Sequence, residues 1–138
     1  MSASKKSPYN PKALARGAKN YGEVYTKRVL DRLNSIDSEF SELFQAFVYG
    51  GLYDRDVIDH KTRELCAIAG LVVSGFVPQL RAHFDACRRY GATDEEIREV
   101  IFQMAVYGGM PAALSALNEF ENYRSSENPT LGFGDPGN

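Results

Sequence analysis

The chain has 138 residues, of which 43% are hydrophobic and 25% are charged. This length and composition predict one globular domain that buries about two thirds of its unfolded surface. Sixteen Lys and Arg residues against eighteen Asp and Glu give a net charge of −2, and no basic block is longer than two residues. Nucleic acid is therefore not an expected partner.

The domain boundaries follow from composition. Residues 1–10 are polar and predict a flexible N-terminal arm, without the apolar segment of a signal peptide. Residues 11–125 predict a single helical domain, and residues 126–138, with two prolines and three glycines, predict an irregular tail. The longest apolar run, Cys66–Val73, is too short to cross a bilayer, so no membrane partner is expected.

The two cysteines, Cys66 and Cys87, each lie within an apolar helical pattern. Free cysteine is among the most buried residue types, so both are expected to be small buried thiols. Unpaired buried thiols fit a reducing compartment, and we expect a cytoplasmic location.

Apolar residues recur every three or four positions through most of the chain, which predicts helices. One helix is expected from Pro11 to about Leu33, although two internal glycines each cost about 1 kcal/mol relative to Ala. A second helix is expected to begin at Ser35–Asp37 and to end at Gly50–Gly51.

Four more helices are expected in the rest of the chain. Asp59 is a suitable N-cap for a helix that ends near Val73. Pro78 fits the first turn of the next helix, which ends at Gly91. Thr93–Glu96 form a capping box, and a final helix runs from Pro111 to about Tyr123. No strand pattern is present, so the predicted fold class is all-α, with about six helices.

Glu64 and His83 are the strongest candidates for catalytic residues. Each is an ionisable side chain on an otherwise apolar helix face. A carboxylate and an imidazole in apolar surroundings form a general acid/base pair. The alternatives are structural: His83 as a core or interface residue and Glu64 as half of a salt bridge.

Other side chains are candidates for substrate binding. Arg63 adjoins Glu64, and Gln79 lies one helical turn before His83, where it would orient the imidazole or a substrate carbonyl. Tyr53, Arg55 and Tyr107 lie beside glycine breaks, where loops border clefts. Surface or subunit contacts are the alternative for these residues.

The sequence motifs of metal sites, phosphate-binding loops and serine hydrolases are absent. No HxxxH, HxxE or cysteine cluster is present, and Glu64 with His83 supplies too few ligands, so no metal site is predicted. The Gly–Gly pairs lead into no phosphate-binding pattern, and there is no Gly-x-Ser-x-Gly elbow. We expect no cofactor, and we expect His60, in the first turn of a helix, to be exposed.

Two segments, YGGLYDRDVIDHKTREL (49–65) and PQLRAHFDACRRYGATDEEIREVIFQMAVYGGMPAALSAL (78–117), resemble the carboxymuconolactone decarboxylase family. The combination of a histidine, a Gly-x-Thr-x-Glu-Glu-Ile helix start and a Tyr-x-Gly-x-Pro segment is specific, and it covers about half of the chain. The resemblance implies an alkylhydroperoxidase D-like helical fold that assembles into homotrimers or homohexamers.

The resemblance also separates two branches of the superfamily. The peroxidase-like branch has a CxxC pair seven and four residues before the histidine, where this chain has Phe76 and Gln79. Its proton-relay glutamate, nineteen residues before the histidine, is present as Glu64. The redox dithiol is therefore absent, and a thiol peroxidase is disfavoured.

The decarboxylase branch is more similar. Gly51–Arg55 resembles its Gly-x-Trp-x-Arg segment, with Tyr53 in place of tryptophan. Gln79 stands where that branch has a glutamate, and glutamine cannot exchange a proton.

The resemblance implies a cofactor-free carboxy-lyase of aromatic catabolism that acts on a small lactone or keto acid. His83 would donate the proton and Glu64 would be the relay, while Arg55 or Arg63 would hold a substrate carboxylate. Gln79, Tyr53 and Tyr107 would shape the pocket. The alternatives are an isomerase, hydratase or other acid/base enzyme on the same scaffold, or a non-catalytic oligomer.

Overall fold

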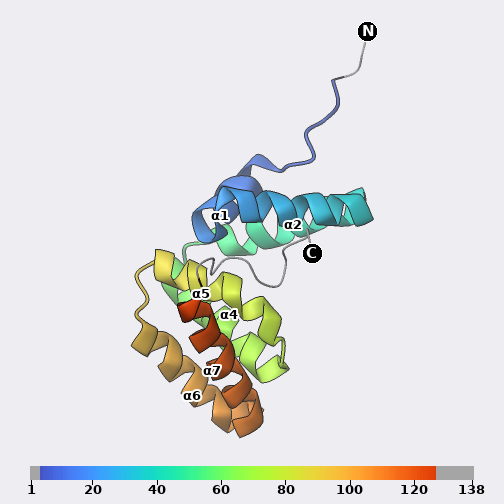
Figure 1. The fold of residues 1–138 in the computed structure, drawn as a ribbon. Helices are drawn as coiled ribbons and strands as arrows, with labels where there is room; N and C mark the ends of the chain where they lie inside the picture. The colour runs from blue at the N-terminus through green and yellow to red at the C-terminus, as the bar shows by residue number, and fades with distance from the viewer. Residues whose placement is uncertain (1–3, 127–138) are drawn as a thin grey trace. The chain divides into compact units, whose positions relative to one another are not determined.

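The computed structural model describes residues 4–126, and within them it contains helices and no strand (Figure 1). The predicted all-α fold is confirmed. These residues contain seven α-helices rather than the predicted six. They form two compact units, residues 4–55 and 56–126, and the predicted single domain of residues 11–125 stays a prediction. Nearly all of the predicted tail lies outside the described residues.

The first unit begins with two helices where one was predicted. Its elements are α1 (Pro11–Tyr21), α2 (Glu23–Ile36), α3 (Ser38–Phe44), the π-helix η1 (Gln45–Tyr49) and the 3₁₀-helix η2 (Leu52–Asp54). Gly22 separates α1 from α2 with a φ of 88°, which lies in the left-handed region that favours glycine. The prediction of one continuous helix was wrong at this residue.

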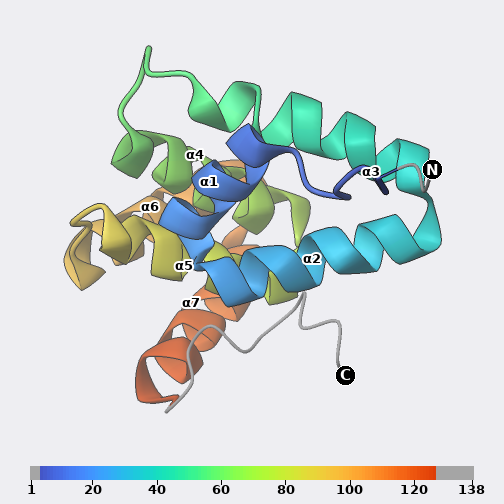
Figure 2. The same ribbon diagram turned by 90° about the horizontal axis from the view of Figure 1, so that it is seen from above.

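The crossing of α1 and α2 depends on Gly17. A Cβ atom at this position would lie 2.3 Å from Cγ2 of the buried Thr26, so only glycine allows this approach. Asp37 then caps α3 by accepting from the backbone N–H of Phe40 at 2.8 Å, and the chain reverses direction there (Figure 2).

Part of the predicted N-terminal arm is bound to the first unit through Gln45. The buried Gln45 side chain accepts from Asn10 N–H at 2.7 Å and donates to the Pro8 carbonyl at 2.9 Å. Tyr9 also donates its hydroxyl to Asp31 at 2.5 Å. The first residue of η1 thus attaches residues 8–10 to the helices that follow.

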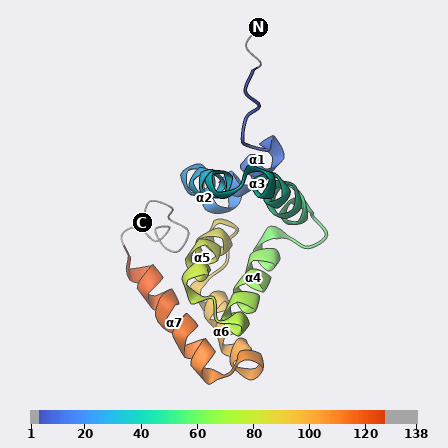
Figure 3. The ribbon, with the colours of Figure 1, turned by 90° about the vertical axis from the view of Figure 1, so that its right-hand side faces the viewer.

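The second unit consists of four helices that run alternately in opposite directions (Figure 3). They are α4 (His60–Ser74), α5 (Leu80–Arg89), α6 (Asp94–Gly108) and α7 (Met110–Ser125), with the 3₁₀-helix η3 (Val77–Gln79) before α5. Gly75 ends α4 in the left-handed conformation with a φ of 76°, as the predicted break requires. Gly109, with a φ of 93°, lets α7 begin directly after α6.

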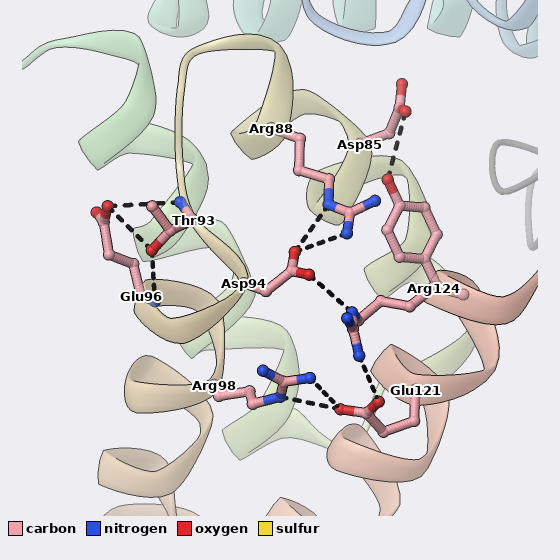
Figure 4. A network of polar contacts seen from close by, with 9 residues as sticks. Asp85, Arg88, Thr93, Asp94, Glu96, Arg98, Glu121 and Arg124 are labelled. Carbon is pink, nitrogen blue, oxygen red and sulfur yellow. Dashed lines mark hydrogen bonds and ion pairs between the residues drawn. The ribbon is translucent and has the colours of Figure 1, made fainter.

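Two of the predicted start signals of these helices are confirmed, whereas Pro78 lies in η3 and α5 begins only at Leu80. Asp59 accepts from Thr62 N–H at 2.7 Å at the start of α4. Thr93 and Glu96 form the predicted capping box at the start of α6 (Figure 4).

Aromatic rings fix α7 against α5 in the core of the second unit. The Phe84 ring lies 4.9 Å from that of Phe120 and 5.5 Å from that of Tyr123, centroid to centroid. Each such pair contributes about 0.5–1.5 kcal/mol beyond the burial of its area. The remaining core is aliphatic and includes Ile68 and Ile101, which have no exposed surface.

A network of ion pairs joins α5, α6 and α7 at one end of this unit (Figure 4). Asp94 accepts from Arg88 at 2.6 Å and from Arg124 at 2.7 Å. Arg124 also donates to Glu121, which accepts from Arg98 at 2.9 Å. Because the partners come from three helices, the network fastens that end of the bundle.

Candidate functional site

Glu64 lies in the second turn of α4, on the face of the helix that forms the core. Glu64, Ile68 and Val72 are spaced by four residues, and none has exposed surface. Burying a carboxylate among aliphatic side chains is costly unless a partner compensates for the lost water. The position therefore requires a hydrogen-bond donor.

His83 of α5 is that donor. Its Nδ1 lies 2.6 Å from Oε2 of Glu64, a distance typical of a charge-assisted hydrogen bond. The carboxylate accepts from Nδ1–H, which fixes the orientation and the tautomer of the imidazole. The side chain of His83 is 18% exposed, whereas that of Glu64 is fully buried. The two residues that the sequence singled out therefore meet, with the imidazole on the more accessible side.

The cysteines take no part in this pair as reactive groups. Cys87, one turn after His83, has no exposed surface. Burial, reinforced by the negative charge of Glu64, raises the pKa of the Cys87 thiol and keeps it protonated. Cys66 is exposed, so the prediction that it is buried was wrong. It lies two residues from both Glu64 and Ile68, which turns it away from the core face of α4.

Gln79 and Arg63 lie next to the pair along their helices. Gln79 is the last residue of η3, half-buried and four residues before His83. Arg63 is half-buried on α4 beside Glu64. Their roles in substrate binding stay predictions.

Tyr107 lies apart from the pair. It is 69% exposed near the C-terminal end of α6, and the next residue, Gly108, packs on Val73 near the end of α4. Val73 follows Glu64 by nine residues, which corresponds to about 13 Å along a helix. In the second unit, Tyr107 is therefore a surface residue at the end of the bundle.

Tyr53 and Arg55 belong to the first unit. Tyr53 in η2 is half-buried, with its ring edge-on to Tyr49 at 6.4 Å. Arg55 follows η2 and is exposed. Their contribution to a substrate site stays a prediction.

His60 corrects another expectation. It is partly buried rather than exposed, because its ring packs at 5.2 Å on that of Tyr90, centroid to centroid. His60 and Glu64 are one turn apart on α4 and therefore lie on the same face of that helix. His60 contacts Tyr90 at the end of α5, and Glu64 contacts His83 within α5. The sequence signal for this contact was the four-residue spacing, which places both residues on one helix face.

Residues 4–126 contain no group of three or more His, Cys, Asp or Glu side chains that could hold a metal ion. Across the same residues, every helix is too short or too polar to span a bilayer.

The family model of carboxymuconolactone decarboxylases matches residues 38–122, which is more than half of the chain and includes both members of the pair. The chain belongs to the carboxymuconolactone decarboxylase family. The predicted family resemblance is confirmed.

Individual relatives agree with this assignment. The chain is 33% identical over 100 residues to 4-carboxymuconolactone decarboxylase of Acinetobacter baylyi, covering 72% of this chain and 75% of that protein. It is 33% identical over 108 residues to an uncharacterized 15.0 kDa protein of Paracoccus denitrificans, covering 76% and 78%. It is also 26% identical over 96 residues to a nitrosuccinic acid decarboxylase of Metarhizium robertsii, covering 70% and 67%.

Proposed function

We propose that this member of the carboxymuconolactone decarboxylase family is a cofactor-free carboxy-lyase that acts on a small lactone or keto acid. The observation that carries the proposal is the 2.6 Å contact between the buried Glu64 carboxylate and Nδ1 of His83. Two relatives with decarboxylase names support the reaction class. The names of these two relatives specify different substrates, so the substrate class proposed here is broader than either of them.

The chemistry assigns a role to each member of the pair. Decarboxylation breaks the C–C bond to the substrate carboxylate, and CO₂ leaves while the electron pair moves onto an adjacent carbonyl oxygen. A proton must then be added to the carbon. The imidazolium of His83 would deliver that proton, and solvent would return one before the next turnover.

Glu64 would act as the relay behind the imidazole. Its carboxylate accepts from Nδ1–H, so the proton for the substrate would come from the other ring nitrogen, Nε2. The negative charge of Glu64 would balance the positive charge of the imidazolium between turnovers. The buried position keeps this charge close to the ring and away from water.

The remaining candidates would bind the substrate. A guanidinium group suits a carboxylate because it donates two parallel hydrogen bonds, so Arg63 or Arg55 would hold the acid group. Gln79 would contact the substrate carbonyl and Tyr53 would shape the pocket, whereas the exposed position of Tyr107 at the end of the bundle does not support such a role for it within one chain. We further propose that the protein works in the cytoplasm as a homotrimer or homohexamer.

CO₂ release from a panel of lactone acids, β-keto acids and nitro acids tests the proposal. With a substrate from the panel, His83→Ala should lower turnover at least about 10²-fold. His60→Ala is the matched control, because it removes the other histidine of the chain, and it should retain turnover in proportion to the folded protein. Near-normal turnover by His83→Ala would overturn the role of His83.

An isomerase or hydratase would use the same acid/base pair. The products distinguish these enzymes, since isomerisation and hydration retain the carboxylate carbon. Substrate consumption without CO₂ would replace the lyase by one of these reactions, and His83 would keep its role if His83→Ala abolished that consumption.

A further inference from the structure

The first unit contains a cavity of about 300 Å³ between the N-terminal arm and the helices α3 and η1. Residues 6–11 form one wall, and Glu42, Gln45 and Ala46 form the other. We call this space the arm cavity. Its volume lies at the lower end of the range of ligand pockets, about 300–1,000 Å³, so it suits a small molecule.

A π-helical turn builds the inner wall of the arm cavity. The backbone N–H of Gly50 donates to the Gln45 carbonyl, five residues earlier, at 2.8 Å. Turns of this kind are rare and occur frequently at functional sites, so this one favours a role beyond packing. It begins at Gln45, the residue that joins the two walls.

The amide of Gln45 fixes the width of the arm cavity. Its carbonyl oxygen accepts from Asn10 N–H, and its nitrogen donates to the Pro8 carbonyl at 2.9 Å and to the Ser41 hydroxyl at 3.1 Å. Both N–H groups of the amide are therefore used in holding the arm. Charged recognition of a ligand must come from the rim.

The rim carries one positive and one negative charge. Nζ of Lys6 lies 3.8 Å from Oε1 of Glu42, and these side chains are 88% and 67% exposed. So exposed and long an ion pair contributes little to stability, and its two partners exchange readily with other charged groups. Each of them can therefore contact a ligand.

This arrangement selects a ligand with both charges. A simple anion would be attracted by Lys6 and repelled by Glu42, and a simple cation would meet the reverse. A molecule that places a carboxylate on Lys6 and an ammonium group on Glu42 gains from both contacts. An α-amino acid carries these two groups on one carbon, so its charges are as close together as those of the rim.

The remaining lining indicates the kind of side chain. Pro8, Pro11 and Ala46 present apolar atoms to the arm cavity. An aliphatic side chain would cover them, whereas a further charge on the ligand would have no partner there.

We propose that the arm cavity binds a free α-amino acid with an aliphatic side chain, with its carboxylate on Lys6 and its ammonium group on Glu42. The inference rests on the cavity, its two walls and the charges of its rim, and it does not depend on the proposed lyase activity.

Three ligands that share one side chain test the requirement for both charges. In isothermal titration calorimetry of the full chain, leucine should bind with a dissociation constant of about 1 mM or lower, as suits a ligand of about ten non-hydrogen atoms. N-acetyl-leucine keeps only the carboxylate and leucine methyl ester keeps only the ammonium group, so each should bind at least about 10-fold more weakly.

Variants of the rim locate the binding. Lys6→Ala and Glu42→Ala should each raise the dissociation constant of leucine at least about 10-fold. Lys5→Ala and Glu39→Ala are the matched controls, because they remove exposed charges of the same sign from the arm and from α3 outside the cavity lining. The double variant with Lys6→Glu and Glu42→Lys should bind leucine more tightly than either alanine variant, because the ligand can turn to match the exchanged charges.

All substituted side chains are exposed, and circular dichroism checks that the variants keep the wild-type helix content. The proposal is overturned if leucine shows no saturable binding, or if either derivative binds as tightly as leucine does. It is also overturned if Lys6→Ala or Glu42→Ala binds leucine as the wild type does, or if the two control variants lose as much affinity.

Discussion

Glu64 and Asp94 are both carboxylates that accept a hydrogen bond of 2.6 Å, but their surroundings are opposite. Glu64 accepts from His83 and has no exposed surface, whereas Asp94 lies near the surface and accepts from Arg88 and Arg124. Water can replace any lost partner in the Asp94 network, and each such ion pair contributes about 0.2–1 kcal/mol. Water cannot do so at Glu64.

This difference indicates what each region does. The Asp94 network contains several ion pairs and joins three helices, as expected of a network that stabilises helix packing (Figure 4). A buried ionisable pair contributes little to stability, because well-packed apolar residues in its place would stabilise the contact between two helices as well or better. The presence of Glu64 in the core therefore favours a chemical role for the Glu64–His83 pair.

The sharpest test of the comparison is Glu64→Gln. The amide keeps the volume and can still accept from His83, but it carries no charge to balance an imidazolium. We expect CO₂ release to fall at least about 10²-fold, with little change in the melting temperature. Asp94→Asn should show the reverse pattern, and equal loss of turnover in both variants would remove the distinction between the two regions.

The next effect concerns stability. Asp94→Ala removes the acceptor shared by Arg88 and Arg124, and we expect the free energy of unfolding to fall by about 1 kcal/mol in urea titrations. Glu95→Ala is the control, because it removes an exposed acid from the same first turn of α6. If both variants lost the same stability, the network would contribute no more than the helix dipole does.

The network also predicts a pH dependence. Partial burial would raise the pKa of Asp94, but hydrogen bonds from Arg88 and Arg124 outweigh it and leave the pKa below its ordinary value of 3.8. The stabilisation is therefore present above pH 3.8 and is lost as the pH falls through the lower folded-state pKa. The stability difference between wild type and Asp94→Ala should be larger at pH 7 than at pH 3, and an unchanged difference would contradict the assignment.

Features set by neighbouring residues were predictable from the sequence. The capping box at Thr93 and Glu96 and the N-cap at Asp59 depend on residues three apart, and both are confirmed. The break at Gly22 was missed because the apolar spacing continues across it from Tyr21 to Tyr25. Only the tertiary contact of Gly17 with Thr26 shows why the chain turns there.

The candidate site was likewise predictable only where it depends on residues close together in the sequence or on the family spacing. Helical periodicity placed Glu64 and His83 on apolar faces, and the family spacing of nineteen residues implied that they act as a proton-transfer pair. Whether the two side chains meet was left open by the sequence, and the contact between them is seen only in the fold. The Asp94 network could not be foreseen, because Asp94 and Arg124 are thirty residues apart and their pairing depends on how α6 packs on α7. The exposure of Cys66 was missed because an apolar run does not reveal which face of a helix is covered.

The smallest predicted effect separates acid/base chemistry from thiol chemistry. Cys66→Ser changes an exposed side chain on the face of α4 opposite Glu64, so it should alter the free energy of unfolding by less than about 0.5 kcal/mol and leave CO₂ release unchanged. Cys87→Ser buries a hydroxyl in the core and should cost more stability, but the folded protein should retain turnover, because burial keeps this thiol protonated. Turnover per folded protein is the measurement for both variants. If turnover were lost in the folded cysteine variants and retained in His83→Ala, a thiol rather than the Glu64–His83 pair would carry out the reaction.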